Sequence, residues 1–269
     1  MRHFIIPGAT DYRRGCEHMG DEAGRQDADR LAFYLLKGVA RANRLYQLFA
    51  PGERIAVAVS GGKDSAALLE LLRRWQGLPR LELAAVHVTS AGVAGCEGQA
   101  DTAGLEAWFR QLGIPYRIVP MEPPSGQPAR ARMGPCFHCA WRRRKALFFA
   151  AKELGCRRVA LAHHADDAAV TTLLNLVYHG RCETMAPVLE MFGGEIVLIR
   201  PLYLLEERDI AAFVQALGLP FRLSTCARGQ DTRRAHLAGI LRQLEALNPR
   251  VKRNLLRAAG HALDEACEQ

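Results

Sequence analysis

Short apolar segments alternate with helix-compatible segments through the middle of this chain, and this alternation restricts the fold more than any other feature. Five segments have the length and composition of buried strands, at residues 54–59, 81–88, 115–119, 157–162 and 195–200. Helical patterns fill most of the intervals, at residues 65–75, 102–112, 140–154 and 166–178. Because strands separated by helices pair in parallel, we predict an α/β fold with a doubly wound parallel sheet.

The two ends of the chain differ from this middle part. Residues 1–29 carry charges and glycines with little apolar periodicity, which predicts a loose arm. Residues 29–50 have helical spacing up to Pro51-Gly52, and the chain after residue 223 is basic with a helical pattern. We therefore expect an N-terminal arm and helix (1–50), an α/β core (51–223) and a basic C-terminal helical segment (224–269).

Charge and apolar content restrict the partners and the compartment. The formal net charge of +8 favours a polyanion such as nucleic acid, although an arginine-rich composition alone gives the same balance. Apolar stretches reach only strand length and the N-terminus lacks the apolar run of a signal peptide, so we expect no membrane segment and a cytoplasmic protein. The eight cysteines are then expected as buried thiols or metal ligands rather than disulfides.

A glycine-rich loop, Ser60-Gly61-Gly62-Lys63-Asp64-Ser65, follows the first predicted strand and opens a helix. Glycines let backbone amides approach a phosphate, the helix N-terminus offers unpaired N–H groups, and a lysine neutralises phosphate charge. A Walker A loop would need glycine at Val57 and Ser or Thr at Asp64, so a different phosphate loop is indicated. A plain glycine turn capped by Asp64 is the alternative without function.

Two further motifs carry side chains of types that bind metals or take part in reactions. Cys136 and Cys139 form a C-x-x-C pair before a helix expected to begin near Trp141; alone, the pair fits zinc, a redox dithiol, a cluster or chance. The segment His163-His164-Ala165-Asp166-Asp167 ends a predicted strand and opens a helix. Its carboxylates either cap that helix or face the crevice at the carboxyl ends of the strands. Cys156, at the start of a strand, is expected in the core.

These motifs resemble those of a known family. SGGKDS is similar to the pyrophosphatase loop of the adenine nucleotide alpha hydrolase (PP-loop ATPase) superfamily. The order SGGKDS, C-x-x-C, HHADD, RPL and a lone late cysteine resembles the tRNA-thiolating branch. Within it the chain is similar to the 2-thiocytidine synthetases (TtcA) and more distantly to the TtuA-type 2-thiouridine synthetases. The lack of terminal C-x-x-C zinc modules favours the cytidine type.

The resemblance implies a Rossmann-like core that adenylates the C2 carbonyl of a tRNA base, expected to be cytidine 32 of the anticodon loop, and replaces its oxygen with sulfur. The implied cofactors are ATP, Mg²⁺ and a [4Fe-4S] cluster with one open iron, held by Cys136, Cys139 and Cys226. The implied catalytic residues are Asp167, Asp64 and Arg143. The implied ATP-binding residues are Ser60, Gly61, Gly62, Lys63, Asp64, Ser65, His87, Val88, Ala162, His163 and Asp166.

Basic residues are expected to contact tRNA phosphates without reading sequence. Those predicted to bind RNA are Arg142, Arg144, Lys145, Arg228, Arg233 and Arg234, and further tail residues suited to phosphate contacts are Arg242, Arg250, Lys252, Arg253 and Arg257. A charge run such as residues 142–145 is equally often only a solvated face. The sulfur is expected from sulfide or a sulfur-donor protein, and both a monomer and a homodimer remain open.

Three alternatives compete with the cytidine thiolase. A TtuA-type 2-thiouridine synthetase modifies another base, a tRNA-lysidine synthetase-like ligase adenylates the same oxygen without a cluster, and a cluster-bearing nucleotide sensor catalyses nothing. The chain also departs from the family at two places. Ala162 stands where the family has glycine, and residues 89–101 are rich in glycine and alanine where a substrate-facing loop is expected.

Overall fold

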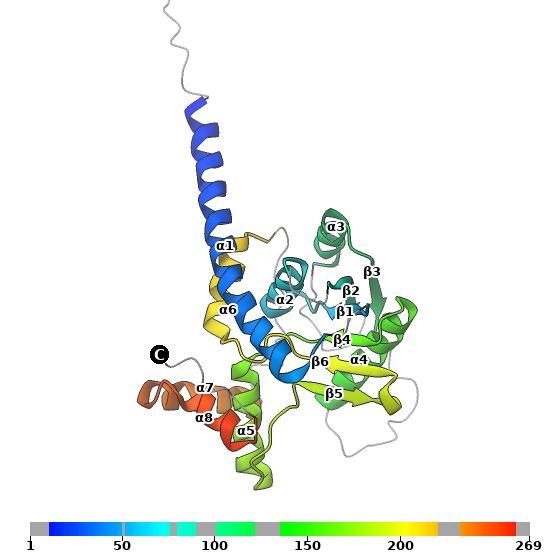
Figure 1. Cartoon of the computed structure of the whole chain (residues 1–269), viewed down its shortest axis with the longest axis vertical. Coiled ribbons are helices and arrows are strands. Elements are labelled where there is room, and N and C mark those ends of the chain that lie inside the picture. The colour runs from blue at the N-terminus through cyan, green and yellow to red at the C-terminus, as the bar shows by residue number, and fades with distance from the viewer. Residues whose placement is uncertain are drawn as a thin grey trace, which may run out of the picture.

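Figure 1 presents the computed structural model of the chain, which describes residues 11–49, 52–75, 80–89, 101–121, 135–219 and 232–261. Side chains are described from residue 26 in the first range and from residue 138 in the fifth. Within these ranges no helix combines the length and the apolar character needed to cross a membrane.

A six-stranded sheet forms the centre of the molecule. Its strands are β1 (Arg54–Ala58), β2 (Glu82–Thr89), β3 (Tyr116–Pro120), β4 (Arg158–Ala160), β5 (Val188–Met191) and β6 (Ile196–Ile199), in the order β3-β2-β1-β4-β6-β5. All neighbours pair in parallel except β5 and β6, which are antiparallel. The predicted α/β fold and its five strands are confirmed. The antiparallel edge strand β5 was not predicted from the sequence.

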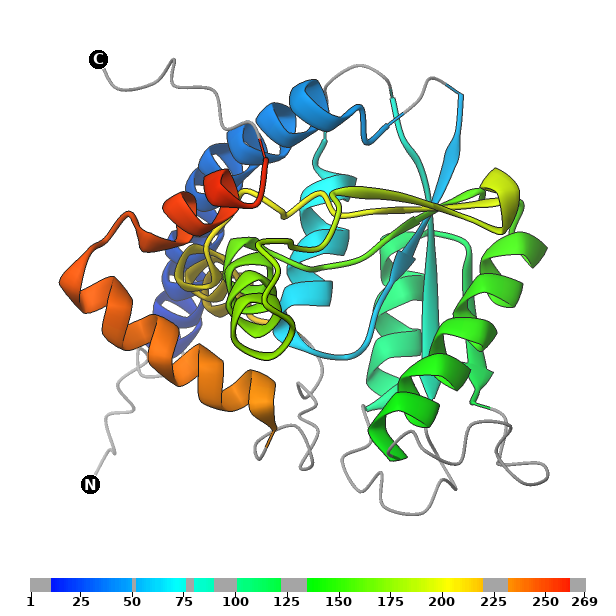
Figure 2. The same cartoon turned by 90° about the horizontal axis from the view of Figure 1, so that it is seen from below.

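Helices cover both faces of the sheet. The helices of the described residues are α1 (Asp11–Tyr46), α2 (Lys63–Arg73), α3 (Thr102–Leu112), α4 (Pro135–Glu153), α5 (Ala165–His179), α6 (Glu207–Leu217), α7 (Arg233–Leu247) and α8 (Val251–Ala258). Because side chains alternate along a strand, Ile55 and Val57 pack in the core formed with α1, α2, α3 and α6, whereas Ala56 packs in the core formed with α4. In Figure 2 the sheet is seen nearly edge-on, with α2 on one side and α4 on the other.

The N-terminal helix α1 (Asp11–Tyr46) is longer than predicted and extends beyond the rest of the molecule (Figure 1). The prediction of a loose arm over residues 1–29 and a helix over 29–50 is therefore corrected: the helix begins at Asp11 and ends at Tyr46. Apolar periodicity reports packing against a partner, and Ala28 is the first buried residue among the side chains described from residue 26 onward. Backbone hydrogen bonding needs no such partner, and no proline interrupts residues 11–46.

Helices α5, α7 and α8 form a separate bundle beside the sheet (Figure 1). A third buried cluster joins them, with Val170 of α5, Leu237 and Leu241 of α7, Leu256 of α8 and Tyr203 of the connection after β6. Because α5 also begins at the end of β4, the C-terminal helices are packed directly onto an element that starts at the sheet.

The strand order creates a switch point between β1 and β4. The chain leaves β1 toward β2 and β3 on one side, whereas β4 pairs with β6 on the other. In open α/β sheets, the crevice outside the carboxyl ends of such strands is where ligands bind. The loop Ser60–Ser65 follows β1 and the segment His163–Asp167 follows β4, so both motifs border this crevice.

Candidate active site

The glycine-rich loop after β1 is held by its two serines. Gly61 has a φ of +85°, a conformation that favours glycine, and Gly62 is the residue preceding α2. The Ser65 hydroxyl is buried; it accepts from the Ser60 backbone N–H at 3.1 Å and donates to the Gly62 carbonyl at 2.8 Å. The Gly62 N–H donates to the Ser60 hydroxyl at 3.2 Å. Ser65, predicted among the ATP ligands, therefore shapes the loop from inside.

Lys63 and Asp64 open helix α2 and form an ion pair. The Lys63 Nζ lies 3.0 Å from the Asp64 Oδ1 and 2.7 Å from the Glu207 Oε1 at the start of α6. Burial opposes the charged form, but Glu207 and Asp64 together raise the pKa of Lys63. The lysine is thus a cation at the mouth of the loop, and without a phosphate its positive charge is compensated by two carboxylates.

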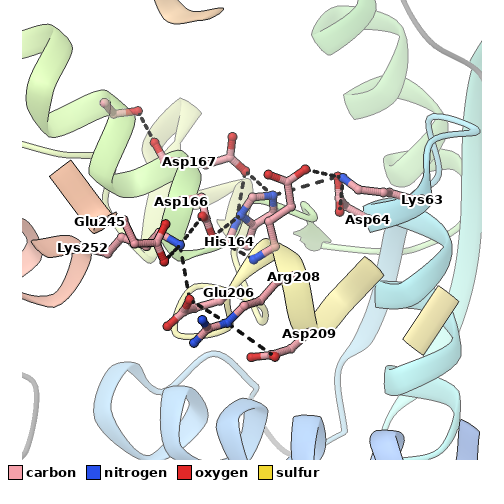
Figure 3. Close-up of polar contacts among 12 residues, drawn as sticks. Lys63, Asp64, His164, Asp166, Asp167, Glu206, Arg208, Asp209, Glu245 and Lys252 are labelled. Atoms are coloured by element: carbon pink, nitrogen blue, oxygen red, sulfur yellow. Dashed lines mark hydrogen bonds and ion pairs between the residues drawn. The ribbon is translucent and has the colours of Figure 1, made fainter. Parts of the chain in front are cut away.

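His164 lies where the two motifs meet (Figure 3). Its ring is 6% exposed, and its Nε2 lies 3.4 Å from the Asp167 Oδ2 and 4.0 Å from the Asp64 Oδ2. Its Nδ1 lies 3.4 Å from the Asp166 Oδ2. Burial disfavours the imidazolium, yet the three carboxylates raise the pKa of His164. The histidine therefore links the carboxylate after β1 to the pair after β4.

The two aspartates of the HHADD segment have different surroundings. The Asp167 Oδ1 accepts from Arg234 of α7 at 2.8 Å, and its Oδ2 accepts from the His164 N–H at 3.1 Å. Against burial, His164 and Arg234 lower the pKa of Asp167. Arg234 also donates to the Thr171 hydroxyl at 3.2 Å. Arg234, predicted to contact tRNA phosphates, is paired here with a carboxylate of the crevice.

Asp166 points the other way, toward the C-terminal helices. Its Oδ2 accepts from the Glu207 N–H at 2.8 Å, and its Oδ1 lies 2.7 Å from the Nζ of Lys252. Although burial acts in the opposite direction, His164 and Lys252 hold the pKa of Asp166 well below its usual range. Lys252, predicted as a phosphate-contacting tail residue, is 7% exposed, and its placement corrects that expectation.

Two more histidines border the crevice in neutral form. Burial, with Arg200 and Arg234 nearby, lowers the pKa of His163 to about 4, although Asp167 acts in the opposite direction. The His163 Nδ1 accepts from the Arg200 Nε at 3.3 Å. At the end of β2, the His87 Nδ1 lies 2.7 Å from the Val59 carbonyl oxygen, and burial lowers the pKa of His87. His87 therefore fixes the exit of β1 to that of β2.

The C-x-x-C pair lies inside a helix and not before one, because α4 begins at Pro135 and not near Trp141. Residues three apart share a helical face, so the backbone places Cys136 and Cys139 on one side of the first turn. Cys139 is a half-buried free thiol, and the nearby Arg143 further lowers the pKa of His87. Helix α4 therefore brings Arg143 toward the end of β2.

Two of the remaining cysteines, Cys156 and Cys182, have described side chains. Cys156 is buried beside β4, and burial raises the pKa of its thiol to about 11, as expected of a core cysteine. Cys182 is exposed beyond the end of α5 opposite to Asp167. Cys226 and Arg228 lie outside the described residues, as does most of the Gly/Ala-rich segment 89–101. Among the described side chains, no three His, Cys, Asp or Glu residues are grouped as metal ligands.

Other predicted residues lie on the surface or at strand ends. Arg142 is half-buried on α4, whereas Arg144 is exposed there; Lys145 lies 5.8 Å from the centroid of the Phe149 ring. Arg233 is exposed on α7 and lies 4.6 Å from the Tyr178 ring centroid. Val88 and Ala162 are half-buried near the ends of β2 and β4. Glu206, Glu245 and Lys252 also belong to the site, and none of them was predicted there from the sequence.

The chain matches known proteins over most of its length. Residues 37–244 match the model of the PP-loop domain. The tRNA-cytidine(32) 2-sulfurtransferase of Anaeromyxobacter dehalogenans (strain 2CP-C) is 38% identical over 243 residues, covering 88% of this chain and 82% of that protein. That of Geobacter sulfurreducens is 35% identical over 240 residues, covering 87% and 91%.

One solved structure shares the fold. The U34-tRNA thiolase NcsA from Methanococcus maripaludis, with its [4Fe-4S] cluster, superimposes with a TM-score of 0.65 at 22% identity, covering 86% of this chain and 80% of that one.

Proposed function

The chain belongs to the PP-loop domain family and, within it, to the tRNA-cytidine(32) 2-sulfurtransferases, and from this membership we propose that it is an ATP-dependent enzyme that replaces the C2 oxygen of cytidine 32 in tRNA with sulfur. One observation carries the proposal: the phosphate loop after β1 and the carboxylates after β4 meet at His164, at the switch point of the sheet. Since its substrate is tRNA, we place the protein in the cytoplasm.

The loop and its lysine suit the pyrophosphate part of ATP. The N–H groups at the start of α2 point into the crevice, and the helix dipole favours an anion there. Lys63 exchanges Glu207 for a phosphate oxygen when ATP binds. Asp64 and Asp167 supply the carboxylate oxygens that Mg²⁺ prefers, and their common neighbour His164 keeps them together. The metal would neutralise charge on the phosphates.

Asp64 and Asp167 are the carboxylates that face the reaction. Asp166 faces the C-terminal helices, with Lys252 on one oxygen and the Glu207 N–H on the other, so we assign it a supporting role behind the site. In the first step the C2 oxygen of the base attacks the α-phosphorus of ATP, and pyrophosphate leaves. The C2 carbon then carries an adenylate. Sulfur forms a bond to this carbon, the C2–O bond breaks, and AMP leaves. Arg143 of α4 lies near enough to His87 to lower its pKa further, and its charge suits the charge that develops on the phosphates.

The first turn of α4 suits an iron–sulfur cluster. Cys136 and Cys139 share a helical face, Cys139 is a free thiol, and a helix N-terminus favours the thiolate that iron requires. We propose Cys226 as the third ligand. When bound, the cluster supplies sulfur at its open iron for attack on the activated carbon, with sulfide or a sulfur-donor protein as the source.

The base must leave its stack to reach the crevice, because the reacting groups lie at the ends of strands and are surrounded by helices. An unpaired or flipped nucleotide in a tRNA loop meets this requirement. On α4, Arg142, Arg144 and Lys145 would contact the phosphates beside it, with Arg228 and Arg233 contributing from the C-terminal part.

Anaerobic cluster reconstitution tests the function directly. Total tRNA is incubated with the protein, ATP and sulfide, and its nucleosides are analysed by mass spectrometry for 2-thiocytidine and 2-thiouridine. We expect 2-thiocytidine and one AMP per thionucleoside. Bound iron without any thionucleoside would refute the proposal, and 2-thiouridine alone would assign the chain to the uridine type.

Two cysteine variants separate the remaining alternatives. Cys139→Ser should lose the cluster absorbance and thiolation, whereas the matched core variant Cys156→Ser should keep both. A colourless but fully active Cys139→Ser protein would indicate a lysidine synthetase-like ligase. Stoichiometric ATP binding without AMP release, in the presence of tRNA and sulfide, would indicate a sensor.

A further inference from the structure

Lys252 is a buried lysine enclosed by acidic side chains from three other helical segments (Figure 3). Its Nζ lies 2.7 Å from the Asp166 Oδ1 at the start of α5, 2.8 Å from the Glu245 Oε1 of α7, and 3.2 Å from the Glu206 Oε2 before α6. An ammonium group has three N–H donors, so each can meet one carboxylate. The side chain is only 9% exposed, and water cannot replace these partners freely.

The position of Lys252 on its own helix is unfavourable. It is the second residue of α8, where the helix dipole disfavours a cation. The burial of its ammonium adds a desolvation penalty. Local structure therefore gives no reason for a lysine here, and the three carboxylates are what hold it in place.

The contacts of Lys252 continue into the crevice. Its partner Asp166 has one oxygen on Lys252, and the other lies 2.8 Å from the Glu207 N and 3.4 Å from the His164 Nδ1. On the other side of the ring, the His164 Nε2 faces Asp167 and Asp64. Glu207 in turn holds Lys63 of the phosphate loop. Lys252 thus stands behind the groups to which the proposed function assigns ATP binding and catalysis.

We propose that Lys252 is a positioning residue of the reaction: it fixes the Asp166 carboxylate, and through it the orientation of His164 and the geometry of Asp167 and Asp64. The inference rests on the proposed function. Lys252 and Glu245 lie beyond residues 37–244, the segment that matches the PP-loop domain, so the ATP site of this chain includes groups outside that domain.

The experiment measures tRNA-dependent pyrophosphate release by the holoenzyme with ATP. Lys252→Met removes the charge, Lys252→Arg keeps it, and Lys152→Met is the matched control, because Lys152 forms an exposed 3.0 Å pair with Glu195 away from the crevice. Supporting groups of this kind typically contribute 10- to 100-fold to activity, so we expect kcat of Lys252→Met to fall by about that factor. The Kd for ATP should change by less than about threefold, since every group that binds phosphate is still present.

The charge-preserving variant separates positioning from folding. Lys252→Arg should fold and recover part of kcat, whereas Lys152→Met should match the wild type. If Lys252→Met does not fold, two other proteins replace it: the single variant Asp166→Ala and the double variant that combines Lys252→Arg with Asp166→Ala. In both of them Glu206 and Glu245 still neutralise the cation. The losses of Lys252→Arg and Asp166→Ala should then not multiply, because one acts through the other.

Two results would overturn the inference. One is a folded Lys252→Met protein, or a folded Asp166→Ala protein, with a lowered melting temperature but a wild-type kcat, which indicates a purely structural ion pair. The other is multiplicative losses in the double variant. If the wild-type holoenzyme itself releases no pyrophosphate with tRNA, the proposed function fails, and that outcome is distinct from either of these.

Discussion

Replacing Ser65 with alanine tests whether the phosphate loop is held by its own serine. The Ser65 hydroxyl is 4% exposed; it accepts the Ser60 N–H at 3.1 Å and donates to the Gly62 carbonyl at 2.8 Å. Alanine removes both bonds, so the Ser60 N–H and the Gly62 carbonyl lose the side chain that joins them. At about 1 kcal/mol for each hydrogen bond, Ser65→Ala should lower the free energy of unfolding by about 2 kcal/mol.

The same loss should appear in nucleotide binding. In Ser65→Ala the loop has lost its internal support and becomes ordered only when ATP binds. That ordering consumes about 2 kcal/mol of the binding free energy, which corresponds to an affinity about 30-fold weaker. Urea unfolding gives the stability, and calorimetric titration with a non-hydrolysable ATP analogue gives the affinity.

Ser60→Ala is the matched control. Ser60 is exposed, so water can satisfy the Gly62 N–H that its hydroxyl now accepts at 3.2 Å. We expect a stability loss below about 1 kcal/mol for this variant. The reasoning is refuted if the two variants lose the same stability, or if Ser65→Ala binds the analogue like the wild type.

The crevice and helix α4 give three further predictions. Glu207→Gln removes a half-exposed ion pair with Lys63 that is worth less than about 1 kcal/mol. Since Lys63 leaves Glu207 when it binds phosphate, the affinity for ATP should stay equal or tighten by up to about fivefold. Weaker binding would show that Glu207 stabilises the ATP-bound protein. The pKa of His163 is lowered to about 4, so the unfolded chain takes up this proton at a higher pH than the folded chain does. The free energy of unfolding should therefore fall as the pH drops from about 6.5 toward 4. His163→Asn should show a shallower fall in urea unfolding, and an unchanged slope would contradict the assignment. Replacing Arg142, Arg144 and Lys145 with alanine should weaken tRNA binding in a filter-binding assay. The slope of log affinity against log salt should fall by about one for each phosphate that is no longer neutralised. An unchanged slope would mark residues 142–145 as a solvated face.

The sheet and its two crevice motifs could be predicted because their signals are local. A buried strand is a continuous apolar run, and a glycine-rich or carboxylate-rich segment directly after it marks a strand end. Strand β5 was not predicted because it has only four residues, Glu190 interrupts its three apolar ones, and all four are at most half-buried. The turn Phe192–Gly194 that reverses the chain, with Gly193 and Gly194 at positive φ, was the signal that could have found it.

The start of α4 was misplaced for a similar reason. Pro135 is a favoured first residue of a helix, but it is the last of four prolines in residues 121–135, a composition typical of a loop. Lys252 and Arg234 could not be placed at all. Each sits in a basic stretch that looks solvated, and their partners Asp166, Glu206, Glu245 and Asp167 are distant in sequence. Only the packing of α7 and α8 against α5 brings them together.

The spread of the site along the chain has a consequence for synthesis on the ribosome. The phosphate loop emerges early, His164 follows past the midpoint, and Lys252 is among the last residues of the described chain. Strand β1 has both its neighbours only after β4 has emerged, and Asp166 has its cation only after α8 has. The nascent chain therefore holds the loop and the first carboxylates in an unfinished pocket until α8 has emerged, and a message truncated before residue 252 should yield a sheet without a competent active site.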